Sequence, residues 1–225
     1  MLPFDGNELR IITVIVILAV ASYYDVKSRE VHDILWVIGG VTGVVLLIFE
    51  ENILSFVVDI GIAMIAAPIA LVLWRTGLFG GADAFAIIII SFITPGLTLS
   101  GSDILPTTIL TNSALLFVLP FMINFTRNGI RLLRHDVMFE DFDENIQRKI
   151  VAMFIGFKAK NAKFAFSIET GQKQKKFSFS LHNADTAKFN EKNDIWVTFA
   201  TPYMLFILSG FLIQIFYGDI LFSHI

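Results

Sequence analysis

The chain has 225 residues, of which 55% are hydrophobic, 17 are lysine or arginine, 20 are aspartate or glutamate and none is cysteine. This composition excludes an ordinary soluble domain and indicates a membrane protein, and the lack of cysteine excludes disulfides, thiol redox motifs and thiolate metal sites. The net charge of -3 is small, so the positions of the cations carry more information than their sum.

Six apolar stretches are candidates for membrane-spanning helices. They cover residues 10–24, 34–49, 53–74, 83–99, 107–125 and 196–217. Several of them approach the roughly 20 residues that a helix needs to cross a hydrocarbon core about 30 Å thick. The first stretch has no basic segment before it and no small-residue cleavage signal after it, so we interpret it as a retained helix. The sequence therefore predicts an all-α polytopic membrane protein with about six transmembrane helices.

Basic residues predict which side of this bundle faces the cytoplasm. With six spans, the loops 25–33, 75–82 and 126–195 share one side, and the opposite side has only Arg10. The cations of the first side that lie near a span are Lys27, Arg29, Arg75, Arg127, Arg131 and Arg134. Because loops rich in lysine and arginine stay inside, we expect a multi-pass plasma-membrane protein whose first set of loops is cytoplasmic.

Residues 128–195 form the only long stretch of ordinary polar composition, and we expect a small cytoplasmic α+β insert there. It separates a membrane domain with helices 1–5, residues 1–127, from a final membrane helix, residues 196–225. Segment 136–154 is compatible with an amphipathic helix that runs into a strand. Segments 163–169 and 176–182 alternate apolar and polar residues around a turn at 170–172, which predicts a β-hairpin. A third strand near 151–157 or the membrane surface would cover its apolar face.

Asp25, at the cytoplasmic end of the first predicted span, is the first candidate catalytic residue. It is followed by Lys27 and Arg29, which lie within reach along the chain. An ordinary structural interpretation is therefore open, in which Asp25 is an interfacial carboxylate that pairs with one of these cations.

Asp83 is the second candidate catalytic residue. It follows Gly80, Gly81 and Ala82 and begins an apolar run. Its structural interpretation is a helix N-terminal aspartate that the helix dipole stabilises, with the glycines as a simple turn. Glycines also permit close approach of another backbone or of an extended substrate, which is the functional interpretation.

The predicted topology puts Asp25 and Asp83 at the same membrane face, where they can meet. Two close carboxylates share a proton, so one can act as general base on a water while the other, protonated, polarises a carbonyl. This chemistry needs no metal and no cofactor, and we predict none. The sequence has no zinc-spaced His/Glu cluster, nucleophile elbow, P-loop or dinucleotide fingerprint.

The motifs around these aspartates resemble those of the type IV prepilin peptidases, a family of GxGD membrane aspartic proteases, and of its archaeal preflagellin peptidases in particular. The motif Gly-Gly-Ala-Asp at 80–83 is similar to the family's signature, and Asp25 followed by Arg29 and Asp33 resembles its first catalytic block. Residues 196–202 resemble the Thr-Pro segment that opens the last membrane helix.

The resemblance implies an aspartic endopeptidase that removes the short basic leader from preflagellin or prepilin-like precursors at the cytoplasmic membrane face. Asp25 and Asp83 would be the catalytic pair. Two departures from the family pattern are Ala82 in place of glycine and Phe85 where many relatives have lysine. Because the methylating bacterial relatives carry a cysteine-rich domain that this chain lacks, we expect peptidase activity alone.

A basic leader needs acidic partners. The residues expected to bind substrate or support the motif are Gly80, Gly81, Ala82, Glu30 and Asp33. An acidic run in the insert either binds the leader or is a solvated helix face: Asp136, Glu140, Asp141, Asp143 and Glu144. The predicted partners are therefore preflagellin or prepilin-like precursors and the lipid bilayer, without nucleic acid and with the oligomeric state open.

Other functions stay open on the residues alone. A proton- or ion-coupled membrane transporter would use Asp25, Asp83 and Asp59 as ion sites deep in the bilayer. A non-enzymatic assembly scaffold would depend on neither aspartate of the pair. Within the protease class, a presenilin-like enzyme would cleave transmembrane helices instead of leaders.

Overall fold

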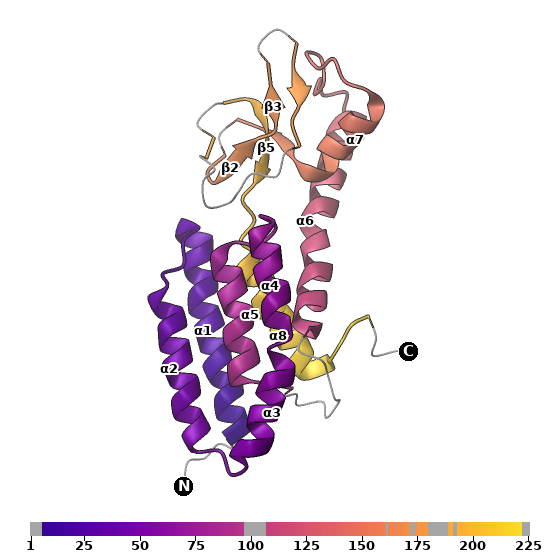
Figure 1. Cartoon of the computed structure of the whole chain (residues 1–225). Helices are drawn as coiled ribbons and strands as arrows, with labels where there is room; N and C mark the ends of the chain where they lie inside the picture. Colours follow the sequence, from indigo (N-terminus) through magenta and orange to yellow (C-terminus); the bar gives the residue numbers. More distant parts are fainter. Residues whose placement is uncertain are drawn as a thin grey trace. The chain divides into compact units, whose positions relative to one another are not determined.

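The computed structural model describes residues 6–96, 107–160, 162–171, 174–179, 189–190 and 193–221. Over these residues the chain is mostly helical with a small β region (Figure 1). It divides into two compact units. We call residues 1–116 and 202–225 the bundle unit and residues 117–201 the mixed unit.

The bundle unit is built from apolar helices. Its helices are α1 (Gly6–Ser28), α2 (Ile34–Ile48), α3 (Ile53–Ala63), α4 (Ala66–Arg75), α5 (Gly81–Ile93), α8 (Tyr203–Tyr217) and the start of α6 (Thr108–Leu133). Three segments are long and apolar enough to cross a membrane, namely α1, residues 53–75 and α6, whereas α2, α5 and α8 are shorter. The chain is therefore a mostly helical membrane protein, and the six crossings and the cytoplasmic insert stay predictions.

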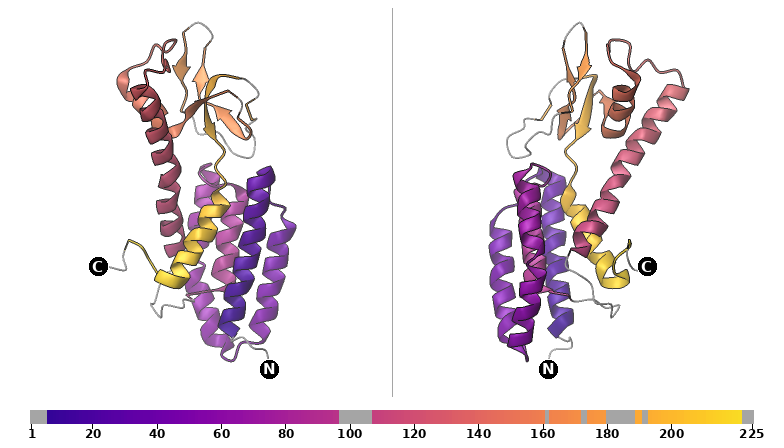
Figure 2. Two further views of the ribbon diagram at one scale, coloured as in Figure 1. Left: turned by 180° about the vertical axis from the view of Figure 1, so that it is seen from behind. Right: turned by 45° about the vertical axis from the view of Figure 1, so that its right-hand side comes forward.

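Helix α5 contacts α1, α2, α4 and α8, and Figures 1 and 2 show it among the other helices of the bundle unit. Its alanine and isoleucine side chains are buried on several sides, including Ala84 and Ile90. Helix α2 approaches it through glycines: a Cβ on Gly43 would lie 2.5 Å from the Phe92 ring, and one on Gly39 would lie 3.1 Å from Ile89. Small residues at such a crossing let two backbones pack closely.

Prolines interrupt or end two of the predicted spans. The span expected at 53–74 is present as the apolar segment 53–75, which is interrupted at 64–65 between α3 and α4. Pro68 has no N–H to donate to the carbonyl of Met64, four residues earlier, which explains the break. The span predicted at 83–99 ends as a helix at Ile93, because Thr94 precedes Pro95 and a residue before proline disfavours helical dihedrals. Residues 97–99 lie outside the described residues.

The last span begins later than the sequence indicates. Residues 196–199 were expected to be helical, but they belong to strand β5 (Ile195–Phe199), and α8 starts only at Tyr203. Trp196 and Val197 pair there with β1 (Phe157–Ala159) and Val197 also pairs with β2 (Ala165–Ser167), both antiparallel. These apolar residues therefore form a strand of the sheet, although hydropathy alone assigns them to the membrane.

The mixed unit has two cores, one rich in aromatic side chains and a smaller one that is mainly aliphatic. Its elements are the remainder of α6, α7 (Ile146–Ile155), the sheet β1-β5-β2, and the pair β3 (Glu169–Thr170) and β4 (Lys176–Phe177). Trp196 is fully buried, stacks on Phe139 at 5.1 Å and donates its indole N–H to the carbonyl of Met138 at 3.2 Å. The indole thus ties β5 to the segment between the two helices.

The predicted β-hairpin is present in a shorter form. Strands β3 and β4 pair antiparallel around Gly171, whose φ of 94° suits a turn that glycine makes without strain. The residues before β3 pair elsewhere: β2 joins β5 instead of the second hairpin strand. The third strand is β1 at 157–159 rather than 151–157, because residues 146–155 form α7. Residues 172 and 180–182 of the prediction lie outside the described residues.

Candidate active site

Asp25 lies in the last turns of α1, and its side chain is 17% exposed. Its Oδ2 accepts a hydrogen bond from the backbone N–H of Met204 at 3.1 Å. Met204 is the second residue of α8, and the first N–H groups of a helix have no partner within the helix. The carboxylate of α1 therefore satisfies one of these donors and lies in the positive field of the α8 N-terminus.

Arg29 supplies a second positive charge to Asp25. Its Nη1 lies 4.0 Å from Asp25 Oδ1, and its side chain is 16% exposed. Its backbone has φ of 61°, in the left-handed region that costs a non-glycine residue about 1 kcal/mol or more, and its N–H donates to the Asp25 carbonyl at 3.1 Å. Burial lowers the pKa of Arg29, and the neighbouring Asp25 charge opposes this effect. The chain thus turns directly after α1 so that the guanidinium faces the carboxylate.

Asp83 lies in the first turn of α5 and is 8% exposed. Its Oδ2 accepts a hydrogen bond from the backbone N–H of Gly80 at 2.9 Å. Of the glycines at 77, 80 and 81, all described, only Gly77 has a positive φ, 78°. Gly80 is extended and Gly81 packs against the Trp74 ring. The glycines of the motif therefore serve close packing and not a left-handed turn.

The bundle unit brings Asp25 and Asp83 to the same end. Helix α8 contacts both α1 and α5 there, and the charge of Asp25 is close enough to act on Asp83. The Tyr203 hydroxyl in turn interacts electrostatically with Asp83, and its ring packs on Phe79 at 4.9 Å between ring centroids. The two carboxyls lie near the ends of three helices and influence each other electrostatically. They can share one proton, so that the protonated carboxyl acts as an acid and the ionised one as a base.

Two residues of this site were missed by sequence reasoning. Phe79 immediately precedes the motif at 80–83, and Tyr203 immediately follows Pro202. The signal in the sequence is an aromatic residue next to each of two motifs, at 80–83 and 196–202. Their contact depends on the packing of α8 against the segment before α5, which a sequence pattern does not contain.

The other predicted site residues are at the edge of the bundle unit. Glu30 and Asp33 are exposed in the turn between α1 and α2. Asp33 caps α2 through its backbone, without a side-chain cap hydrogen bond. Ala82 is half-buried against the core, and Phe85 is 38% exposed.

Asp59, the third aspartate of the transporter alternative, is exposed on α3. The two aspartates of the pair are both more enclosed than this side chain. Asp59 is therefore not part of the arrangement formed by Asp25 and Asp83.

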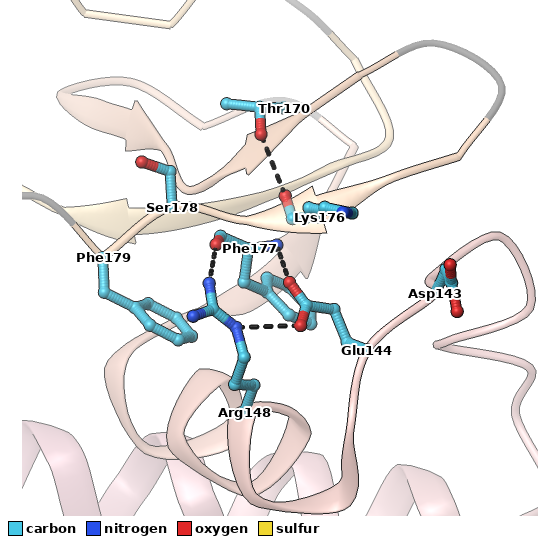
Figure 3. A pocket seen from close by; sticks show the side chains of 8 residues that line it. All are labelled: Asp143, Glu144, Arg148, Thr170, Lys176, Phe177, Ser178 and Phe179. Carbon is cyan, nitrogen blue, oxygen red and sulfur yellow. Dashed lines mark hydrogen bonds and ion pairs between the residues drawn. The ribbon is translucent and has the colours of Figure 1, made fainter.

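The acidic run of the mixed unit includes two residues in ion pairs, since Asp136 pairs with Arg131 at 3.1 Å and Glu144 pairs with Arg148. Glu144 pairs with Arg148 at 2.8 Å and accepts the N–H of Phe177 at 2.9 Å, while Arg148 donates to the Phe177 carbonyl. These groups line a pocket of about 510 Å³, in which Figure 3 shows Asp143 apart from the pair. The Glu144–Arg148 ion pair therefore lies in the lining of this pocket, and its charges already have partners.

Metal-assisted chemistry has no candidate centre in the described part of the chain. Among these residues no group of three or more histidine, cysteine, aspartate or glutamate side chains could hold a metal ion. The groups at the Asp25–Asp83 end that can transfer protons are the two carboxyls.

Comparison with known proteins gives matches over most of the chain. Residues 12–130 match the model of the type IV leader peptidase family, and residues 118–220 match that of the archaeal peptidase A24 C-terminus, type II. The preflagellin peptidase of Methanocaldococcus jannaschii is 24% identical, over 90% of this chain and 91% of the relative. The preflagellin peptidase of Methanococcus maripaludis is 25% identical, over 90% of this chain and 92% of the relative.

Proposed function

The chain belongs to the type IV leader peptidase family, and from this membership we propose that it is a GxGD-type aspartic endopeptidase whose catalytic pair is Asp25 and Asp83. Its substrates are preflagellin or prepilin-like precursors, from which it removes the short basic leader at the cytoplasmic membrane face. The names of the two relatives support this substrate class. No cofactor enters the reaction.

One observation carries the assignment of the pair. Asp25 and Asp83 come from helices separated by more than fifty residues, yet both carboxyls are held by backbone N–H groups, of Met204 and Gly80, at one end of the same bundle. A carboxylate that only stabilises a helix needs no second carboxylate beside it, and like charges at short range disfavour each other. The electrostatic repulsion between the two carboxyls is explained if they act together on a substrate.

The surroundings of the two carboxyls support different roles for them. Arg29 and the α8 N-terminus supply positive charge to Asp25, so we assign it the ionised form and the role of general base. Asp83 is more deeply buried and accepts one N–H, so we assign it the shared proton. Asp25 takes a proton from water as the water oxygen attacks the scissile carbonyl carbon, and Asp83 donates its proton to the carbonyl oxygen.

Collapse of the tetrahedral intermediate completes the reaction. The C–N bond breaks, the leaving amine takes the proton that Asp25 accepted, and Asp83 recovers a proton from the second hydroxyl as the new carboxylic acid forms. Water is consumed, and the products are the leader with a free carboxyl group and the mature protein with a free amine. The two carboxyls return to their starting protonation states, as a catalyst requires.

The membrane arrangement is part of the same proposal. The three shorter apolar helices cross the bilayer together with the three long segments, which makes six crossings. Residues 128–195 lie in the cytoplasm between a membrane domain at 1–127 and a final membrane region at 196–225. The precursor then keeps its apolar helix in lipid while its leader and scissile bond lie in the cytoplasm, where Glu30 and Asp33 are positioned to attract a basic leader.

Cleavage of a defined precursor tests the proposal. The substrate carries a basic leader followed by an apolar N-terminal helix, and the enzyme is the full chain in detergent. We expect wild type to cut, and Asp25→Asn and Asp83→Asn to lose at least about 10³-fold in kcat while remaining folded, because neither can then share a proton. Asp59→Asn is the matched control and should cut normally.

The position of the cut distinguishes the alternatives. Mass spectrometry should place it at the end of the leader; a cut within the apolar helix would support the presenilin-like alternative instead. If either variant of the pair cuts at the wild-type rate, the catalytic assignment is wrong. A wild type that leaves the precursor intact would favour the transporter interpretation, and equal loss in Asp59→Asn would mean that the effect is not specific to the pair.

A further inference from the structure

Phe79 and Tyr203 form an aromatic contact between the segment before α5 and the first turn of α8. Their ring centroids are 4.9 Å apart with 44° between the planes, and Phe79 is 8% exposed. Tyr203 also packs on Phe206 one turn further along α8, with centroids 6.0 Å apart. Aromatic pairs at this spacing attract each other beyond the effect of the area that they bury.

Each ring is followed in the chain by the residue whose backbone N–H holds one of the two carboxyls. Gly80 follows Phe79 and donates to Asp83 at 2.9 Å. Met204 follows Tyr203 and donates to Asp25 at 3.1 Å. Because consecutive Cα atoms are about 3.8 Å apart and the peptide between them is planar, fixing a ring and its Cα also restricts the amide that follows.

We infer that the Phe79–Tyr203 contact is a positioning element for the carboxylate pair, which sets the separation of Asp25 and Asp83 through the amides of Gly80 and Met204. The inference rests on the proposed function, since it presumes that the two carboxyls act together. Neither ring is a catalytic residue in it: the rings act on the pair through the two amides. The property that matters is the pair of aromatic rings and not the Tyr203 hydroxyl.

The contact is suited to this task because it joins the two parts of the site that are independent in sequence. Phe79 lies in the short loop between α4 and α5, and α8 is more than one hundred residues away along the chain. The way in which two carboxyls share one proton depends strongly on the distance between them. A displacement of about 1 Å at a reacting group can cost on the order of 10²-fold in rate, so loosening this contact should lower kcat much more than it lowers stability.

A double-mutant cycle on leader cleavage tests the inference. The variants are Phe79→Leu, Tyr203→Leu and the two combined, measured on the full chain with kcat and KM determined separately. We expect each single variant to lose on the order of 10²-fold in kcat with KM within about twofold, because the precursor is still bound. The double variant should lose no more than about threefold beyond either single one, because the contact is already absent.

Aromatic exchanges keep the test valid if leucine disturbs folding. Tyr203→Phe and the swap Phe79→Tyr with Tyr203→Phe retain two rings, and both should keep kcat within about threefold of wild type. Phe216→Leu is the matched control, since that ring is 58% exposed on the same helix, and its kcat should be unchanged. Thermal unfolding of every variant accompanies the kinetics.

Three results would overturn the inference. They are a kcat within threefold of wild type in either leucine variant, losses in the double variant that multiply to about 10⁴-fold as for independent side chains, and a Tyr203→Phe variant as inactive as Tyr203→Leu. The Asp25→Asn and Asp83→Asn variants run in the same assay. If they are inactive while the leucine variants are normal, the positioning role fails and the proposed function stands.

Discussion

Helices α1 and α5 extend to both ends of the bundle unit, where the buried side chains have opposite charges. At one end, Arg10 of α1 is 2% exposed and donates to the carbonyls of Leu46 and Ile93 at 2.9 and 3.3 Å. These carbonyls belong to the last turns of α2 and α5, where the helix dipole is negative. Glu50 pairs with the same guanidinium at 3.0 Å. At the other end, α1 and α5 carry Asp25 and Asp83.

The two ends differ in how many partners each buried charge has. Arg10 faces an anion, two carbonyls and the Phe56 ring, whose centroid lies 4.1 Å from its guanidinium carbon. The acidic end instead combines two like groups, each with one backbone N–H, and a single guanidinium 4.0 Å from Asp25. A fully matched charge contributes stability, whereas carboxyls with fewer partners are available to exchange protons. The comparison predicts that changes at the first end alter folding and changes at the second alter chemistry.

The largest effect is expected from Arg10→Met. Removing the cation leaves Glu50 and two helix-end carbonyls without it, and breaking a buried ion pair in this way costs about 3 kcal/mol or more. The free energy of unfolding, measured in mixed micelles with increasing denaturing detergent, should fall by that amount. Lys27→Met removes an exposed cation near the other end of α1 and should change it little. Activity per folded molecule should stay near normal, and a loss of kcat without a loss of stability would contradict the comparison.

Arg29→Ala should have the converse effect. It removes the cation beside Asp25, so we expect kcat of leader cleavage to fall roughly tenfold or more, since a charged neighbour of this kind is worth about 1–3 kcal/mol. Arg29→Lys should recover part of the loss because the charge remains. Stability should fall less than in Arg10→Met, because this ion pair is longer, at 4.0 Å, and alanine keeps the same left-handed backbone strain. Normal kinetics in Arg29→Ala would show that the acidic end does not depend on this charge.

A pair of glycine substitutions sharpens the comparison at the motif itself. A Cβ on Gly80 would stand 3.4 Å from Asp83 Oδ2 at a backbone φ of -75°, which alanine adopts without strain. Gly80→Ala should therefore fold normally and lose less than about tenfold in kcat through crowding of the carboxyl. Gly77→Ala places a side chain at a φ of 78° and should cost about 1 kcal/mol of stability with kcat retained. The reverse pattern would mean that Gly80 is needed for its backbone freedom.

The smallest effect is expected where the leader is proposed to bind. Glu30 and Asp33 are exposed, and exposed charge pairs contribute about 0.2–1 kcal/mol each. The combined variant Glu30→Lys with Asp33→Lys should therefore raise KM for a basic-leader precursor roughly fivefold while kcat is kept. Glu51→Lys, an exposed acidic residue beyond α2, is the control. An unchanged KM at low salt would remove these residues from substrate recognition.

Local sequence predicted much of the fold, and it pointed to the two aspartates whose catalytic role stays a prediction. Membrane character follows from composition, and the long helices follow from uninterrupted apolar runs, because a spanning helix satisfies its own backbone hydrogen bonds. The motif at 80–83 and the position of Asp25 at the end of a span could be read in the same way. The assignment failed at 196–199, where a short apolar run looks alike whether it becomes a buried strand or the start of a membrane helix.

By itself, the sequence determined the class of protein, the helices that are long enough to span a membrane, and the motifs that carry the family resemblance, since each depends on neighbours along the chain. Only the tertiary structure decided that the N–H of Met204 reaches Asp25, that Phe79 packs on Tyr203, and that Arg10 joins the ends of α2 and α5. The residues of each of these contacts are between 36 and 179 positions apart. Contacts between residues so far apart depend on how whole helices pack. A local pattern of residues does not contain that geometry.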